Sequence, residues 1–350
     1  MKIVILAGGL SPERNVSLSS GAMVSEALRE QGHQVALVDL FFGTEGVEGP
    51  AEALYDAPVP QAFKRIGRQA PDLAQVRAAR RDRSPSAIGP GVLELCAGAE
   101  VVYLALHGAC GEDGRIQAAL DLLGVPYTGS NCLSSAIAMD KDMTKRLVAG
   151  QVRTPSWQTV TVTAENLDAL TEETALPAVV KPIASGSSIG VTIAHTRKEL
   201  RRGLEESVRL GGRTVLEQYI KGREIQVAVL NGRALPSIEI IPQADFYDYA
   251  NKYQPGAARE VCPAEIPPEW EKAVGEAALT VFRAIGLSVY ARADFIVTED
   301  GTPYFLEINT LPGMTPTSLV PQEAAAVGIG YADLCQTIVE ASLKARKGGA

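Results

Sequence analysis

The sequence has few of the residues that disulfide, zinc and membrane proteins depend on. It contains only five cysteines in 350 residues, scattered along the chain and without a C-x-x-C pair. This pattern is typical of reduced thiols in a cytosolic protein and argues against a zinc site. No stretch approaches the roughly 20 apolar residues that a membrane-spanning helix needs. We therefore expect a cytoplasmic protein without a membrane partner.

An excess of basic residues is also missing. The chain has 33 Lys and Arg against 41 Asp and Glu, a formal net charge of −8. Nucleic acids and anionic membranes both bind to basic surfaces, so we expect neither as the main partner. Hydrophobic residues make up 46% of the chain, which is enough for a folded core. The length allows two or three domains.

Two common nucleotide-binding motifs are absent as well. There is no G-x-x-x-x-G-K-[ST], and no G-x-G-x-x-G opens a helix. A Gly/Ser loop at 185–190 instead joins two expected strands, and Lys181 precedes it. Its small residues would let backbone N–H groups approach an anion closely. The alternative is a surface hairpin whose lysine reaches solvent along its apolar stem.

The first 40 residues predict the opening of a parallel sheet. An apolar strand at 2–7 turns at Gly8-Gly9 into a helix at 17–31, and a second strand follows at 34–40. This β-α-β order indicates an α/β fold with a parallel-sheet N-terminal domain. No clear pattern covers 43–99. Further strands are expected at 101–106, 177–182, 191–194, 215–220, 225–230 and 234–241, and helices at 115–123, 134–148, 197–210, 270–285 and 331–345.

A hairpin near the C-terminus carries the strongest chemical signal. The runs 292–297 and 304–309 alternate, and Glu299-Asp300-Gly301-Thr302 is a hairpin-turn signal. A turn centred on Asp300-Gly301, with an even number of loop residues, pairs Asp294 with Glu307 and Arg292 with Asn309. All four side chains then share one face. A three-residue loop would break this pairing.

The shared face predicts a metal site. Opposed side chains have Cβ atoms roughly 5 Å apart, and like charges there destabilise the sheet. Two carboxylates, Asp294 and Glu307, become favourable together with the Asn309 amide oxygen if a hard cation lies between them. Mg²⁺ takes oxygen ligands and usually holds substrate phosphates too. The hairpin therefore predicts a Mg²⁺–nucleotide site, and the alternative is a solvated sheet face.

A second nucleotide signal lies earlier in the chain. Glu217 and Glu224 flank an expected strand–turn–strand segment. Main-chain polar groups there would suit adenine, and the carboxylate of Glu224 would suit the ribose hydroxyls.

Six motifs in a fixed order carry a family resemblance. They are G-G-L-S-P-E-R-N-V-S (8–17), L-H-G-A-C-G-E-D-G (106–114), A-M-D-K (138–141), K-P (181–182) with G-S-S (186–188), F-Y-D-Y (246–249) with K-Y (252–253), and E-I-N-T-L-P-G-M-T (307–315) with S-L-V-P (318–321). Together they closely resemble the D-alanine–D-alanine ligases, ATP-grasp enzymes of peptidoglycan precursor synthesis. The resemblance covers nearly the whole chain except about 43–99.

The resemblance implies a three-domain ATP-grasp fold and a reaction. An N-terminal domain at 1–138 would bind the first substrate, and a central subdomain at 139–216 would carry the Gly/Ser phosphate loop. A C-terminal subdomain at 217–350 would carry the metal and acceptor sites. The implied reaction joins two D-alanines through an acyl phosphate and releases ADP and phosphate, in a homodimeric enzyme.

It also implies how ATP and metal are held. The phosphates would meet Lys141 and Lys181, and two Mg²⁺ ions, or Mn²⁺, would bind Asp294, Glu307 and Asn309. The ribose would lie on Glu224. The adenine would lie near Glu217, Gln218, Tyr219 and Ile220.

The amino-acid substrates would meet a third group of residues. Arg292 and the Gly313 N–H would form the oxyanion hole, and Glu13 would hold the first ammonium in a cluster with Ser187 and Tyr253. His107 would lie near the first carboxylate, with an ordinary hydrogen-bonded histidine as the alternative. The residues implied to position the second substrate and the closed loop are Lys252, Ser318 and Leu319.

The chain departs from the family pattern around the acceptor. Thr317 stands where histidine is common, and Ala250-Asn251 replaces Glu-Ala. The same fold with D-serine, D-lactate or another amino acid as acceptor is therefore the nearest alternative, although Tyr253 fits D-alanine. A catalytically silent nucleotide-binding regulator is a second alternative, against which the intact metal and oxyanion residues argue.

Overall fold

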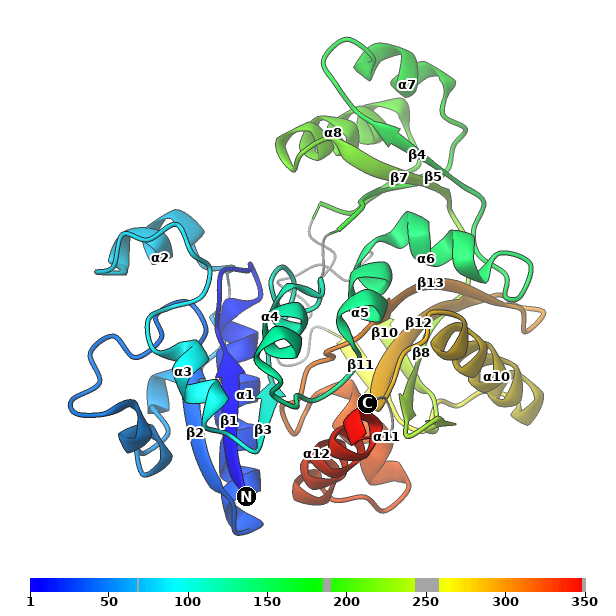
Figure 1. Cartoon of the computed structure of the whole chain (residues 1–350). Coiled ribbons are helices and arrows are strands. Elements are labelled where there is room, and N and C mark those ends of the chain that lie inside the picture. The colour runs from blue at the N-terminus through cyan, green and yellow to red at the C-terminus, as the bar shows by residue number, and fades with distance from the viewer. Residues whose placement is uncertain (68, 185–189, 243–257, 348–350) are drawn as a thin grey trace.

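The strands in the described part of the chain form three separate sheets (Figure 1). The computed structural model describes residues 1–67, 69–184, 190–242 and 258–347. Helices lie between and against the sheets, so the expected α/β class is confirmed.

The first sheet is parallel, as expected. Its order is β2 (Gln34–Asp39), β1 (Lys2–Ala7) and β3 (Val101–Leu104), and α1 (Arg14–Glu30) connects β1 to β2. All four residues of β3 and five of the six in β1 are buried, which explains the continuous apolar runs. The segment without a clear pattern forms only short helices: η1 (Ala51–Tyr55), η2 (Gln61–Lys64), α2 (Leu73–Ala79) and α3 (Val92–Ala97).

A break at Asp140 divides the helical segment after this sheet. Helix α4 (Arg115–Leu123) has the expected bounds. The single helix expected at 134–148 is wrong, because α5 (Cys132–Met139) ends and α6 (Lys141–Val148) begins around Asp140. The Asp140 side chain caps α6 by accepting hydrogen bonds from two backbone N–H groups. Lys141 is therefore the first residue of a separate helix, which runs in a different direction from α5 (Figure 1).

The second sheet is small and antiparallel. Its order is β4 (Trp157–Thr161), β7 (Arg213–Gln218), β5 (Ala178–Pro182) and β6 (Thr192–Ala194). Helices α7 (Leu167–Glu173) and α8 (Arg197–Arg209) pack together beside it (Figure 1). Strand β7 continues to Gln218, so the domain boundary expected between 216 and 217 falls inside a strand.

The third sheet is the largest. Its order is β11 (Ala258–Val261), β10 (Ile238–Pro242), β8 (Arg223–Leu230), β12 (Tyr290–Val297) and β13 (Pro303–Asn309), and β9 (Arg233–Ala234) also pairs with β8. The strand expected at 234–241 is split into β9 and β10. Helix α10 (Pro268–Ala284) packs against β8, β12 and β13.

The β12–β13 hairpin has the predicted pairing for a different reason. Asp294 lies opposite Glu307 and Arg292 opposite Asn309, as predicted. Near the turn, however, Val297 pairs with Pro303, so the loop has an odd number of residues. A bulge after Asp294 shifts the register by one residue. The prediction of an even loop was wrong, and the bulge restores the pairing.

The last helices return to the first sheet. Helix α11 (Leu319–Ala326) contacts β8, and α12 (Tyr331–Lys347) contacts α1 and β3. Leu334 and Ile338 of α12 belong to the same hydrophobic core as Ile3 and Ile5 of β1. Helix α12, which the expected subdomain at 217–350 includes, therefore packs on the N-terminal sheet. Among the described residues, no helix is long and apolar enough to span a membrane.

Packing at the hairpin turn gives a stability prediction. Gly301 has a φ of +82°, and a Cβ there would lie 2.2 Å from the Trp270 indole nitrogen. Gly232, in the β8–β9 turn, has a φ of +73° but open space around it. We expect Gly232→Ala to lower the free energy of unfolding by about 1 kcal/mol through backbone strain alone. Gly301→Ala should lower it at least about twice as much, because Trp270 must also move.

Denaturant unfolding of the two variants measures this difference. Equal losses in both would mean that the contact with Trp270 contributes nothing.

Candidate active site

The paired residues of the hairpin form a charged cluster. The Arg292 guanidinium donates from Nε to Asp294 Oδ1 at 2.8 Å and from Nη2 to Oδ2 at 2.9 Å. Asn309 Nδ2 donates to the same Oδ2 at 3.2 Å. Asp294 and Arg292 are both largely buried. Arg292 Nη1 makes no hydrogen bond with the described residues, so this donor remains for another group.

Lys141 connects the hairpin to α6. Its Nζ lies 3.1 Å from Glu307 Oε2, and its backbone N–H donates to Ile183 O at 3.3 Å. The start of α6 therefore lies between the end of β5 and the hairpin. Each of the two opposed carboxylates, Asp294 and Glu307, thus has a cation beside it.

A buried trio of charges lies behind this cluster. Glu217 Oε2 is 2.7 Å from Lys181 Nζ, and Glu217 Oε1 is 3.0 Å from Lys145 Nζ. Burial lowers the pKa of Lys145, which is fully buried, and Glu217 opposes this shift. For Lys181 burial also acts downward, but Glu217 outweighs it and the pKa rises. Together the trio carries one net positive charge, which faces the hairpin through Lys181.

Sequence reasoning missed Lys145. It lies one helical turn after Lys141, so both project from similar faces of α6. A second lysine at this spacing, on a helix that starts beside a predicted phosphate ligand, was the available signal.

The segment proposed for adenine has little free backbone. The N–H of Gln218 donates to Ser156 O at 2.9 Å, and that of Tyr219 to Pro177 O at 3.3 Å. The Glu217 carboxylate is occupied by the two lysines. Ile220 directly follows these residues, and Glu224 accepts from Gln226 Nε2 at 3.2 Å.

The N-terminal domain contributes a second group of polar residues. Glu13 is buried at the start of α1, and a Cβ at Gly108 would lie 3.5 Å from its Oε2. His107 Nδ1 donates to Leu311 O at 2.9 Å, since a carbonyl can only accept. Burial lowers the pKa of His107, so its ring is neutral. Its Nε2 is then a buried acceptor without a partner among the described residues.

Glu112 joins this group to the loop after β13. It accepts from Gly108 N at 2.8 Å and from Leu311 N at 3.1 Å. Burial raises the pKa of Glu112 to about 7, and the nearby Glu13 carboxylate adds to the shift. The sequence motif contains Glu112, but no role was predicted for it.

The loop between β13 and α11 is held by its own hydroxyls and by other elements, since Met314 N donates to Ser20 Oγ at 3.2 Å. Ser318 Oγ accepts from Thr315 N at 3.1 Å and hydrogen-bonds Thr315 Oγ1 at 2.7 Å. A Cβ at Gly313 would lie 3.0 Å from Ser318 Oγ, so this glycine and this serine are neighbours. Leu319 is the first residue of α11. Three other predicted residues, Ser187, Lys252 and Tyr253, lie outside the described residues and stay predictions.

Two family models match the chain. The family described as "D-ala D-ala ligase N-terminus" matches residues 2–130, and "D-ala D-ala ligase C-terminus" matches residues 151–340. The chain belongs to the D-alanine–D-alanine ligase family. The predicted resemblance is therefore confirmed.

Individual relatives of this ligase family agree over their full lengths. A D-alanine–D-alanine ligase of Pediococcus pentosaceus is 39% identical over 344 residues, 97% of each chain. One from Anaeromyxobacter dehalogenans is 40% identical over 352 residues, 98% of each chain. The crystal structure of the Bacillus anthracis D-alanine–D-alanine ligase complexed with ATP has a TM-score of 0.75 at 32% identity, covering 100% of both chains. The expected ATP-grasp fold is that of these ligases.

The shifted Glu112 carboxyl gives a pH prediction for the ligase. A pKa raised from 4.5 to about 7 means that the folded protein holds this proton more tightly than the unfolded chain. The stabilisation is complete below pH 4.5 and is lost as the pH rises through about 7. We therefore expect the thermal midpoint of the natural protein to fall relative to Glu112→Gln between about pH 5 and about pH 8.

Thermal unfolding of both proteins across this range provides the measurement. Two parallel curves would show that Glu112 does not titrate there.

Proposed function

We propose that the protein is an ATP-dependent ligase that joins two D-alanine molecules into D-alanyl-D-alanine through an acyl phosphate, for peptidoglycan precursor synthesis. Membership of the ligase family supports the reaction. The observation that carries it is the charged hairpin face beside Lys141 and Lys181. Two opposed carboxylates lie beside two lysines on this face, and these are the groups that the metal and the phosphates of a Mg²⁺–nucleotide would bind.

The donor set fits Mg²⁺. Asp294 and Glu307 face each other across the hairpin, and Asn309 is hydrogen-bonded to Asp294. Within the described ranges no three Asp, Glu, His or Cys side chains cluster as a metal site, so two carboxylates and one amide would hold the metal with phosphate and water. Two Mg²⁺ ions, or Mn²⁺, would offset charge on the transferred phosphoryl group.

ATP would lie between the second and third sheets. Lys141 and Lys181 would turn from their carboxylate partners toward the phosphates, while Lys145 keeps Glu217 neutralised. Because Gln218 and Tyr219 already use their N–H groups, adenine would bond the Ile220 backbone. Glu224 would accept from the ribose hydroxyls. ATP bound to the Bacillus anthracis ligase supports this nucleotide assignment.

Acyl transfer would use Arg292 and the loop after β13. The amine of the second D-alanine attacks the acyl phosphate, and the carbonyl oxygen becomes negative. Arg292 Nη1 and the Gly313 N–H would donate to that oxygen, which is the usual arrangement of an oxyanion hole. Ser318 holds the loop in shape, and Leu319 would border the acceptor together with Lys252.

The first D-alanine would bind beside Glu13. Its ammonium suits the Glu13 carboxylate, with Ser187 and Tyr253 in the predicted cluster. The neutral His107 ring offers only an acceptor at Nε2, which also suits an ammonium. We therefore propose that His107 faces this ammonium rather than the carboxylate that the resemblance implied.

Three broader expectations accompany this proposal. The enzyme would be a cytoplasmic homodimer, and its five cysteines are free thiols, which suits that compartment. Domains would divide near residue 138 and after Gln218, with α12 joining the N-terminal domain. Its partners would be ATP and D-alanine.

The proposal is tested by a substrate panel. Phosphate release from ATP is measured with D-alanine, L-alanine, and D-alanine plus D-lactate, and the products are identified by mass. We expect phosphate release only when D-alanine is present, and D-Ala-D-Ala as the dominant product at neutral pH. Release without any amino acid, or none with D-alanine, would contradict the ligase activity. A product dominated by D-Ala-D-Lac would overturn the acceptor alone.

The oxyanion role predicts the behaviour of one variant. Arg292→Lys keeps the charge but loses the planar guanidinium. We expect kcat to fall by at least about 100-fold, the usual effect of losing one oxyanion donor, with an unchanged KM for ATP.

The exposed Arg283→Lys serves as the control and should match the natural enzyme. A raised KM for ATP with normal kcat in Arg292→Lys would make Arg292 a nucleotide ligand instead.

A further inference from the structure

Glu323 is a fully buried carboxylate outside the site described so far. It lies on α11 with no exposed surface, although a buried glutamate without a cationic partner is rare. Its Oε1 accepts from Ala228 N at 2.8 Å. Its Oε2 is buried and has no hydrogen-bond partner among the described residues. A buried carboxyl oxygen without a partner lowers the free energy of unfolding, and an apolar side chain of similar size would avoid this loss. The carboxyl group therefore needs a role that an apolar side chain could not fill.

The Glu323 side chain supplies a hydrogen-bond acceptor at a gap between β8 and β10 in the third sheet. Strand β10 pairs with β8 only from Glu224 to Gln226, and beyond this the chain of β10 moves away. Further along this edge of β8, Ala228 O accepts from Leu235 N at 2.8 Å. The Ala228 N–H on the same edge donates to the Glu323 side chain instead of to a strand. A buried N–H without a partner destabilises a protein by about 1–3 kcal/mol. The Glu323 side chain takes the place of the missing strand.

The position of this gap connects Glu323 to Arg292. Ala228 pairs with Arg292 in the β8–β12 ladder, so Glu323 binds the backbone directly beside the proposed oxyanion donor. Burial raises the pKa of Glu323 well above its ordinary value, while the Ala228 N–H and the Arg292 charge act in the opposite direction. Arg292 therefore lies within the electrostatic reach of this carboxyl.

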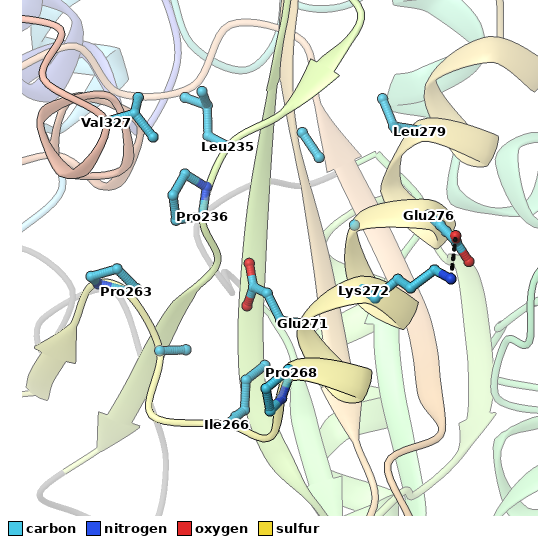
Figure 2. Close-up of a pocket in the computed structure, with 13 residues that line it drawn as sticks. Leu235, Pro236, Pro263, Ile266, Pro268, Glu271, Lys272, Glu276, Leu279 and Val327 are labelled. Atoms are coloured by element: carbon cyan, nitrogen blue, oxygen red, sulfur yellow. Dashed lines mark ion pairs between the residues drawn. The ribbon is translucent and has the colours of Figure 1, made fainter.

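The other end of the connection is the acceptor loop. Helix α11 begins directly after Ser318, whose hydroxyl hydrogen-bonds Thr315, so the helix and the loop that carries Gly313 are joined at this serine. Val320 and Ala324 pack into the core, but a groove of about 690 Å³ lies between Val327, which follows α11, and α10 (Figure 2). Glu271 of α10 borders this groove and binds Ser237, on the far side of the same gap.

We propose that Glu323 is a positioning residue that fixes the distance between Arg292 on β12 and the Gly313–Ser318 loop. This inference rests on the proposed function, since those two elements supply the two oxyanion donors. Glu323 touches no substrate. It acts by holding α11 against Ala228 of β8, the residue that pairs with Arg292.

Two substitutions at this position separate the roles. Glu323→Gln keeps a carbonyl oxygen for the Ala228 N–H, whereas Glu323→Leu fills similar space without an acceptor. We expect Glu323→Leu to lose about 10- to 100-fold in kcat with an unchanged KM for ATP, because a donor misplaced by about 1 Å can cost that much. Glu323→Gln should keep at least about half of the natural kcat. Leu204→Ala, in the separate core beside the second sheet, provides a control that loses stability away from this connection.

Hydrogen exchange gives a readout that does not need activity. Amides over 311–326 and at Ala228 should exchange faster in Glu323→Leu than in the natural protein, Glu323→Gln or Leu204→Ala. Normal kcat in folded Glu323→Leu, unchanged exchange, or an equal defect in Glu323→Gln would each overturn the proposal. An inactive natural protein would instead contradict the proposed function, and exchange would still decide whether Glu323 fixes the loop.

Discussion

The site depends on holding two carboxylates opposite each other on one hairpin. Asp294 and Glu307 repel, and a sheet tolerates such a pair only if each carboxylate meets a cation. Arg292 binds the first in a two-pronged contact, and Lys141 pairs with the second. Arg292 belongs to the hairpin itself, but Lys141 comes from α6. Repulsion within the third sheet is thus relieved by a helix that also touches the second sheet.

The same logic extends to the lysines behind the hairpin. Lys181 and Lys145 would repel each other, and Glu217 lies between them with one oxygen toward each. Breaking such a buried set by removing one member leaves an uncompensated charge, which is strongly destabilising. Cations are therefore assembled beside the hairpin before any nucleotide arrives. Glu112 and Glu323 stabilise the backbone in a similar way, since each side chain accepts a hydrogen bond from the N–H of a distant residue, Leu311 and Ala228 respectively.

Local patterns in the sequence predicted the elements and the facing pairs well. Lys2–Ala7 and Arg115–Leu123 have the predicted bounds because their apolar periodicity is unbroken. The pairing of Asp294 with Glu307 was predicted from an even loop, yet an odd loop and a bulge produce it. Alternation of side chains on a buried face fixes which residues face each other, and the turn adjusts to that requirement.

Long-range contacts could not be predicted in this way. Asp140 reads as part of a helix in sequence, and its capping role appears only when α6 leaves in a new direction. Glu217 looked like an adenine neighbour, whereas its carboxylate binds two lysines from other elements. The packing of α12 on the first sheet also joins residues more than 300 positions apart, for which no local signal exists.

Calorimetry of ATP binding with and without Mg²⁺ tests the central claim most directly. The claim is that opposed carboxylates on the hairpin form a site for metal-bound phosphate. Mg²⁺ should tighten ATP binding to the natural protein by at least about 10-fold, and Glu307→Gln should lose most of that gain. Glu299→Gln, in the turn of the same hairpin, should behave like the natural protein. An equal gain from Mg²⁺ in Glu307→Gln and the natural protein would contradict the account.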